Sequence, residues 1–334
     1  EGGGAAPISC RNGAGSKLHG EGGGAAPISC RNPAGRGRAR ADWRLRPLLG
    51  LPEDPLPTPD PVDAPFEAAE ASAAALVAAT GVERHDVAVV LGSGWRPAAD
   101  LLGEVAAELA MTDLGGFPEA SVAGHGTTVR SIVDGDRRIL AFLGRVHLYE
   151  GHHPNVVAHA VRTAVRAGCS TVVLTNAAGG VRDGLRVGQP VLIRDHVNLT
   201  GRTPLLGPND DRLGPRFPDM GDAYSARLRA LAREVDPSLE ECVYAGFLGP
   251  TYETPAEVAM AQVLGGELVG MSTVLEVIAA VHAGAEVLAL SLVTNLAAGL
   301  GDETLAHDDV LAVAAPSAER MGGLIADVVG RLDR

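Results

Sequence analysis

The stretch VAVVLGSG, residues 87–94, decides the fold of this chain. Five consecutive apolar residues, three of them Val, predict a short strand buried on both faces, and the Gly-Ser-Gly turn that follows ends the strand. An Ala-rich segment at 66–80 precedes the strand and predicts a helix. A buried strand next to a helix is typical of a domain in which helices cover a mostly parallel sheet.

Strands and helices continue to alternate from this point to the end of the chain. We predict further strands at 128–133, 138–143, 171–175, 190–197, 242–248, 267–271 and 286–294, and helices at 155–167, 222–235, 255–264, 273–283 and 308–331. The pattern predicts one α/β domain at 63–334, with a mixed, largely parallel central sheet flanked by helices. Since ligands of such sheets bind at the carboxyl ends of the strands, the residues after each strand are the candidates for function.

The N-terminal segment has a different composition. EGGGAAPISCRN occupies residues 1–12 and returns at 21–32, and the segment 51–65 contains six Pro. Two Gly-rich copies are too few for a stacked repeat fold, which needs three or more. We therefore expect 1–62 to be a disordered Gly/Pro-rich extension and linker outside the folded domain.

Charge and composition exclude several classes of function. The net charge is −13, and because residues 1–50 hold eight Lys or Arg and three Asp or Glu, the remainder carries −18. A body this acidic is a poor general binder of nucleic acid, so any anion must bind at a small local site. The apolar runs are far shorter than the roughly 20 residues of a membrane span, and the four Cys lack the spacing of disulfide or zinc sites. We expect a cytoplasmic protein without a nucleic-acid or membrane partner.

Polar residues suited to an anion follow three of the predicted strands. Ser93 lies between two Gly, whose backbone freedom lets N–H groups turn toward an anion, although a plain tight turn is the alternative. Arg145 and His147 are two residues apart, so they project to the same side of an extended chain and can clamp an oxyanion, unless the loop is merely solvated. Ser272 precedes a predicted helix, where it is either an N-cap or part of an anion site.

A second group of residues suits a flat heterocycle. The ring of Tyr252 can stack on such a ligand and Glu253 can accept its N–H groups, although an acid at this position also favours the dipole of the following helix. The amide of Asn295, at a strand end, can both donate to and accept from a purine edge. The His-rich segment 145–153 lacks the known metal-ligand spacings, so a metal is disfavoured. Taken together, the strand ends favour a site for phosphate and a base.

Nine motifs occur in a characteristic order: VVLGSGW, VAGHG, GRVHLYEGHH, LTNAAGGV, RDHVNLTGRTPL, RFPDM, LGPTYETPAE, VGMSTVLEV and SLVTNLAAG. From about residue 66 to 330, this series resembles the trimeric, 6-oxopurine-preferring purine nucleoside phosphorylases, most closely the bacterial, actinobacterial members. The resemblance implies a cytoplasmic homotrimer of purine salvage. It would cleave inosine, guanosine and their 2′-deoxy counterparts to the free base and α-(deoxy)ribose 1-phosphate, without a cofactor, because inorganic phosphate is a co-substrate.

The resemblance also implies a role for individual residues. Phosphate would be bound by Ser93, His125, Arg145, His147, the backbone amide of Ala177, and Ser272. The nucleoside would contact Tyr149, Tyr252, Glu253, Met271, Asn295 and His307, together with Phe217 of a neighbouring subunit. Catalysis would rest on Asn295, Glu253 and His147. Leu296 stands where many members have Lys, which puts any role for a cation there in doubt.

Two alternatives stay open at this stage. Methylthioadenosine phosphorylases share the fold but prefer 6-amino purines, and they typically have Asp where this chain has Asn295. A non-catalytic purine-binding protein is expected to lose its phosphate ligands first, whereas every phosphate position is filled here. The sequence does not distinguish inosine from guanosine as the preferred substrate.

Overall fold

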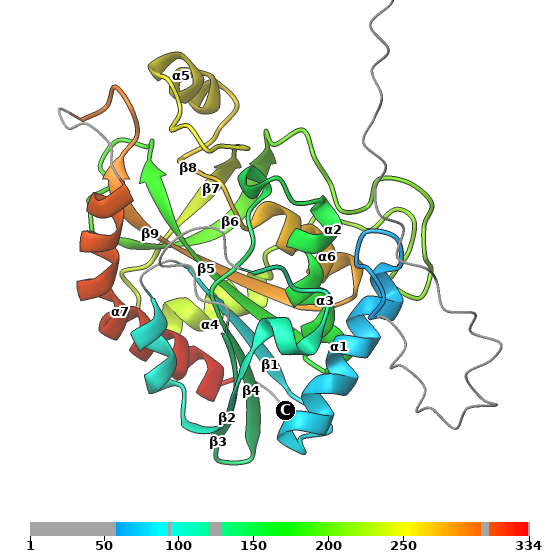
Figure 1. Cartoon of the computed structure of the whole chain (residues 1–334). Coiled ribbons are helices and arrows are strands. Elements are labelled where there is room, and N and C mark those ends of the chain that lie inside the picture. Colours follow the sequence, from blue (N-terminus) through cyan, green and yellow to red (C-terminus); the bar gives the residue numbers. More distant parts are fainter. Residues whose placement is uncertain (1–57, 93–94, 120–127, 302–306, 333–334) are drawn as a thin grey trace, which may run out of the picture. The chain divides into compact units, whose positions relative to one another are not determined.

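The computed structural model describes residues 58–92, 95–119, 128–301 and 307–332, which build a central sheet with helices on both faces (Figure 1). Within these residues, nine strands follow the order β2-β3-β4-β1-β5-β8-β7-β6-β9, and β5 also pairs with β9. Five of the nine pairings are parallel and four are antiparallel, which confirms the predicted mixed sheet. The strands are β1 (Val87–Leu91), β2 (Glu104–Ala110), β3 (Thr128–Asp134), β4 (Arg137–Leu143), β5 (Thr171–Gly180), β6 (Pro190–Asn198), β7 (Glu240–Gly246), β8 (Leu268–Gly270) and β9 (Glu286–Leu296).

The helices cover the sheet in two layers. They are α1 (Pro65–Thr80), α2 (Pro154–Val157), α3 (His159–Arg166), α4 (Ala226–Val235), α5 (Pro255–Val263), α6 (Val274–His282) and α7 (His307–Gly330). Figure 1 shows α1, α3 and α6 on one side of the sheet and α4 with α7 on the other. No helix in the described ranges is long and apolar enough to cross a membrane.

Strand β1 explains why both layers form. All five of its residues are buried, as predicted from VAVVL. Because side chains alternate along a strand, Ala88 and Val90 belong to the core under α1, α3 and α6, whereas Val87, Val89 and Leu91 belong to the core under α4 and α7. A strand that is apolar at every position therefore needs a helix layer on each face.

Strand β2 was not predicted. Its sequence, EVAAELA, is rich in Ala and Glu, which favour helices, and most of its residues are exposed or half-buried. It pairs with β3 at the edge of the sheet, where backbone hydrogen bonds rather than apolar side chains hold it. Glu108 adds ion pairs to Arg96 at 2.7 Å and to Arg130 at 2.6 Å. An edge strand of this kind leaves little signal in the hydropathy pattern.

Two other predictions differ from the structure in ways that have a clear physical reason. The helix predicted at 155–167 is two helices, α2 and α3, which meet at Ala158. The strand predicted at 171–175 continues to Gly180, because β9 pairs with it along its whole length. This extension carries the backbone of 176–179 into the centre of the molecule.

Removing residues 1–57 is expected to leave the melting temperature unchanged, because that segment is Gly-rich and lacks a core-forming pattern.

Residues 58–62 belong to the predicted linker, yet they lie against the domain. Thr58 packs so closely on Gly115 that a Cβ atom there would collide with it, and the Val62 carbonyl accepts a bond from Asn155 Nδ2 at 3.3 Å. Removing 1–62 should therefore lower the melting temperature by about 2–4 °C. Thermal unfolding of the two truncations checks this, and a large drop for the shorter deletion would contradict it.

Candidate active site

One cavity lies where the carboxyl ends of several strands meet, the place expected for a sheet of this class. It brings together residues that lie as far apart in the sequence as Gly92 and Val310. Nine of the predicted site residues line it: Arg145, His147, Ala177 and Ser272 from the phosphate set, and Tyr149, Tyr252, Glu253, Met271 and Asn295 from the nucleoside set. The two sets therefore share one cavity, with the phosphate set beside the nucleoside set.

Four predicted site residues are not placed in this cavity. Ser93 and His125 lie outside the described residues, as does the side chain of His307, whose backbone begins α7. Phe217 is described, and it is 87% exposed and does not line the cavity of its own chain. Because its side chain is exposed, Phe217 is not a buried anchor of the loop within its own chain.

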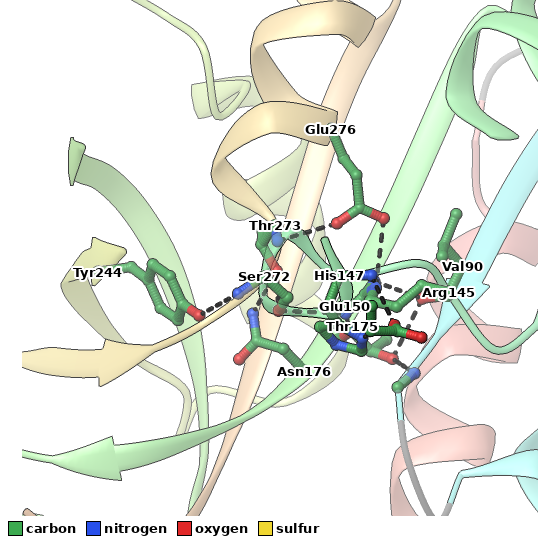
Figure 2. A network of polar contacts seen from close by, with 11 residues as sticks. Val90, Arg145, His147, Glu150, Thr175, Asn176, Tyr244, Ser272, Thr273 and Glu276 are labelled. Atoms are coloured by element: carbon green, nitrogen blue, oxygen red, sulfur yellow. Dashed lines mark hydrogen bonds and ion pairs between the residues drawn. The ribbon is translucent and has the colours of Figure 1, made fainter. Parts of the chain in front are cut away.

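Arg145 is buried at one side of the cavity, just after β4, with only 4% of its side chain exposed. Its Nε donates to Glu276 Oε1 at 3.2 Å, and its Nη1 donates to the Thr175 carbonyl at 2.6 Å (Figure 2). Longer contacts join Nη1 to Ser272 Oγ at 3.4 Å and Nη2 to the Val90 carbonyl at 3.5 Å. The guanidinium is thus held by the end of β1, the middle of β5 and the first turn of α6, in a fixed orientation suited to an oxyanion.

Ser272 lies beside Arg145 in the turn between β8 and α6. The Ser/Thr cap expected at this helix start is present, but the N-cap of α6 is Thr273, so Ser272 is not the capping residue. The Ser272 hydroxyl is 3.0 Å from Thr273 Oγ1, which accepts from Asn176 Nδ2 at 2.9 Å. The Ser272 N–H donates to the Tyr244 hydroxyl at 3.3 Å. Ser272 therefore presents its side chain to the cavity at the N-terminus of a nine-residue helix, where the dipole favours an anion.

His147 and Tyr149 form the next part of the wall. Their rings stack with centroids 4.8 Å apart and planes inclined by 16°. Glu150 Oε1 accepts from the His147 backbone N–H at 2.9 Å and lies 3.3 Å from His147 Nδ1. This carboxylate favours the tautomer with a proton on Nδ1 and fixes the ring orientation. Burial raises the pKa of Tyr149 to about 12, so its hydroxyl stays neutral and able to donate.

Glu253 also lines the cavity and lies in the loop after β7. It is buried, and its Oε1 has no hydrogen-bond partner within the described structure. Burial raises the pKa of this carboxyl. A buried acceptor without a partner is costly, and its place in the cavity wall makes it available to a ligand N–H.

Gly249 brings this loop to the cavity. It adopts a φ of +71°, and a Cβ atom at this position would collide with the sulfur of Met271 and press on the Tyr149 ring. Only glycine tolerates both the conformation and the close approach. The loop that carries Tyr252 and Glu253 is thereby packed directly against Met271 and Tyr149, two of the residues predicted to contact the nucleoside.

Asn295 lies near the end of β9 and completes the wall. Its Oδ1 accepts from Thr294 Oγ1 at 3.0 Å, and its Nδ2 donates to the Leu296 carbonyl at 3.0 Å. These two bonds identify which terminal atom of the side-chain amide is the oxygen and which is the nitrogen. The amide nitrogen carries a second hydrogen, which suits an acceptor on a bound base.

Several buried residues that support this site were not singled out from the sequence: Glu150, Asn176, Tyr244, Thr273 and Glu276. Asn176 is held by Ser291, whose Oγ donates to Asn176 Oδ1 at 2.7 Å. The sequence does contain a pattern that could have identified Glu276, because Thr-x-x-Glu at the start of a helix is typical of a capping box. Tyr244 and Asn176 gave no such signal, since they lie inside apolar strands.

Comparison with known proteins agrees with the site. The sequence profile of the Phosphorylase superfamily matches residues 86–330. The chain is 54% identical over 278 residues to the purine nucleoside phosphorylase of Mycobacterium tuberculosis, covering 83% of this chain and 99% of that protein.

Two solved structures from Schistosoma mansoni share the fold. Isoform 2 of its purine nucleoside phosphorylase, in complex with cytosine and ribose-1-phosphate, has a TM-score of 0.76 at 36% identity and covers 82% of this chain and 99% of that chain. A purine nucleoside phosphorylase in complex with inosine has a TM-score of 0.73 at 32% identity and covers 80% and 96%. By sequence and by fold, the chain belongs to the purine nucleoside phosphorylase family.

Proposed function

We propose that this chain cleaves inosine, guanosine and their 2′-deoxy counterparts with inorganic phosphate, giving the free base and α-(deoxy)ribose 1-phosphate in purine salvage. The observation that carries the proposal is one cavity lined both by the buried Arg145 and by Glu253, whose Oε1 has no hydrogen-bond partner among the described residues. The similar proteins of Schistosoma mansoni support it, since one was solved with inosine and another with ribose-1-phosphate.

The residues of the cavity suit a displacement at C1′ of the sugar. A phosphate oxygen forms a bond to C1′ from the face opposite the base, while the bond from C1′ to N9 breaks and its electron pair passes to the purine. Arg145, His147 and Ser272 would hold the phosphate beneath the cationic sugar, and Asn295 would donate to N7 as the base gains electrons. Positioning and electrostatic preorganisation of this kind need no covalent intermediate, and we propose that no cofactor takes part.

Glu253 gives the site a preference among purines. Its buried carboxylate can accept the N1–H of hypoxanthine or guanine, whereas adenine has no proton at N1. With the wrong base, the carboxylate stays buried without a donor, which costs orders of magnitude in discrimination. The methylthioadenosine phosphorylase alternative is therefore not favoured, and the names of the similar proteins agree.

Phosphate-dependent release of hypoxanthine from inosine tests the proposal. We expect inosine and guanosine to be cleaved when phosphate or arsenate is present and not without it, and adenosine to have a kcat/KM lower by about 10²-fold or more. Base release is followed by absorbance at saturating phosphate, with a phosphate-free reaction as the control. Equal turnover of adenosine and inosine would reject the assignment of Glu253.

We also propose that the enzyme is a cytoplasmic homotrimer whose active site spans two subunits. Phe217 is exposed in a loop that Arg216 holds through hydrogen bonds to the carbonyls of Leu205 and Gly207, at 3.1 and 2.8 Å. Leu206, in the same loop, is 83% exposed. An exposed aromatic next to an exposed Leu suits contact with another molecule. A head-to-tail contact repeated around a three-fold axis closes as a trimer and would place each Phe217 over a neighbouring ribose.

A further inference from the structure

Glu276 does not line the cavity, yet it contacts both Arg145 and the Ser272–Thr273 turn, two parts of the wall proposed to bind phosphate. It lies in the first turn of α6, with 2% of its side chain exposed. Its Oε1 accepts from Arg145 Nε at 3.2 Å and its Oε2 accepts from the Thr273 N–H at 2.9 Å (Figure 2). We propose that Glu276 is a positioning residue, which fixes Arg145 and the Ser272–Thr273 turn in one arrangement before phosphate binds. The expected effect of Glu276 on the turnover of inosine rests on the proposed function, whereas its expected effect on the affinity for phosphate does not depend on that function.

Arg145 depends on this carboxylate for its orientation. Its other short contact is with the Thr175 carbonyl, which carries no net charge and reaches only the Nη1 end of the fork. Glu276 holds the opposite edge, at Nε, and so prevents rotation of a long and otherwise flexible side chain. A guanidinium held in this way keeps the orientation that the chemical step needs.

Thr273 depends on the same carboxylate for its backbone conformation. Its φ is +71° and its ψ is −49°, and among the described residues it is the one non-glycine residue with a positive φ. Such a conformation is strained and persists only where several contacts impose it. Glu276 binds its N–H, and Asn176 Nδ2 donates to its Oγ1 at 2.9 Å. This conformation keeps the Ser272 hydroxyl 3.4 Å from Arg145 Nη1. The carboxylate of Glu276 therefore fixes the positions of both Arg145 and Ser272, two of the residues proposed to bind phosphate.

The carboxylate also sets the electrostatics of the site. Arg145 and Glu276 form a buried ion pair, so the guanidinium is already neutralised before an anion enters. Without the charge of Glu276, Arg145 is a buried cation without a carboxylate partner, which is unfavourable until an anion binds beside it. Removing this charge should therefore strengthen phosphate binding, while loss of the fixed geometry should slow the chemistry. A residue with a purely structural role would not separate these two effects.

The Glu276→Gln variant of the full chain tests the proposal. We expect calorimetric titration with inorganic phosphate to give a Kd about two- to tenfold lower than wild type, because a repelling charge is removed. We expect kcat for inosine to fall about 10- to 100-fold, the scale for small displacements of catalytic groups. The matched control is Glu257→Gln in α5, where the carboxylate accepts from the Thr254 N–H at 2.8 Å in the same type of helix cap. This control should leave the phosphate Kd within about twofold of wild type, since the bond lies outside the anion site.

A second variant separates charge from geometry and serves also if the first fails to fold. Glu276→Asp keeps the charge but is one methylene shorter, so it cannot reach both Arg145 and Thr273. We expect it to lower kcat while the phosphate Kd stays at the wild-type value. The proposal is overturned if kcat is unchanged in both variants, or if Glu276→Gln weakens phosphate binding in parallel with kcat. A wild-type chain that binds phosphate but does not cleave inosine would instead reject the proposed function.

Discussion

Replacing Asn295 by Ala is expected to lower the rate of inosine cleavage by about 10²–10³-fold, the scale for removing one donor that acts in the transition state. The leaving purine gains electron density at N7 as its bond to C1′ breaks, so a donor aimed at N7 stabilises the transition state more than the bound nucleoside. The loss should therefore appear in kcat, with a smaller change in KM for inosine.

The structure supports this role through the orientation of the amide. The Thr294 hydroxyl donates to Asn295 Oδ1 at 3.0 Å, which holds the oxygen in place and leaves the nitrogen as the donor. Both residues line the cavity. Because β9 is buried along almost its whole length, the amide is carried on a rigid strand and is preorganised for the base.

Single-turnover measurements with excess enzyme check the Asn295 prediction under conditions in which chemistry limits the rate. The Asn295→Asp variant has nearly the same shape but an acceptor in place of the amide donor, and it should partly admit 6-amino purines. A wild-type rate for Asn295→Ala in this assay would contradict the proposed role. An unchanged melting temperature for both variants would show that the loss of rate does not reflect unfolding.

Mixing two inactive chains should restore activity if the active site spans two subunits. Phe217→Ala should weaken nucleoside binding while leaving the trimer largely formed, because an aromatic ring over a sugar supplies contact and exclusion of water more than assembly energy. In mixed trimers with Asn295→Ala, a site with Asn295 from one chain and Phe217 from the neighbour is complete. With equal amounts and random exchange, about one quarter of the sites are complete, since each residue is intact in half of the chains.

The control for this experiment is a chain that carries both substitutions. Mixed with Phe217→Ala, it can supply neither Phe217 nor a further intact Asn295, so activity should not recover. Subunit exchange is confirmed separately with differently labelled chains. Absence of recovery in the first mixture, with exchange demonstrated, would show that Phe217 does not complete a neighbouring site.

Much of the fold could be predicted from local sequence because the signal is strong where a strand is buried on both faces. VAVVL at 87–91 predicted β1, and the alternation of strands and helices predicted a sheet flanked by helices; both are present. The edge strand β2 could not be predicted, because its Ala and Glu residues favour a helix and its backbone pairing with β3 leaves no trace in the sequence. The extension of β5 to Gly180 likewise depends on β9, more than a hundred residues away in the chain.

For the site, the sequence by itself predicted the candidate residues: Arg145 and Glu253 follow predicted strands, and Asn295 follows the predicted strand 286–294. All three line one cavity. Only the tertiary structure decided how they are held. The bond from Glu276 to Arg145 joins residues 131 positions apart, and the positive φ of Thr273 is imposed by its neighbours rather than by its residue type. The exposure of Phe217 was also settled only in three dimensions. Residue type and spacing record what a side chain can do, whereas its orientation, partners and strain arise from contacts between distant segments, which no local pattern encodes.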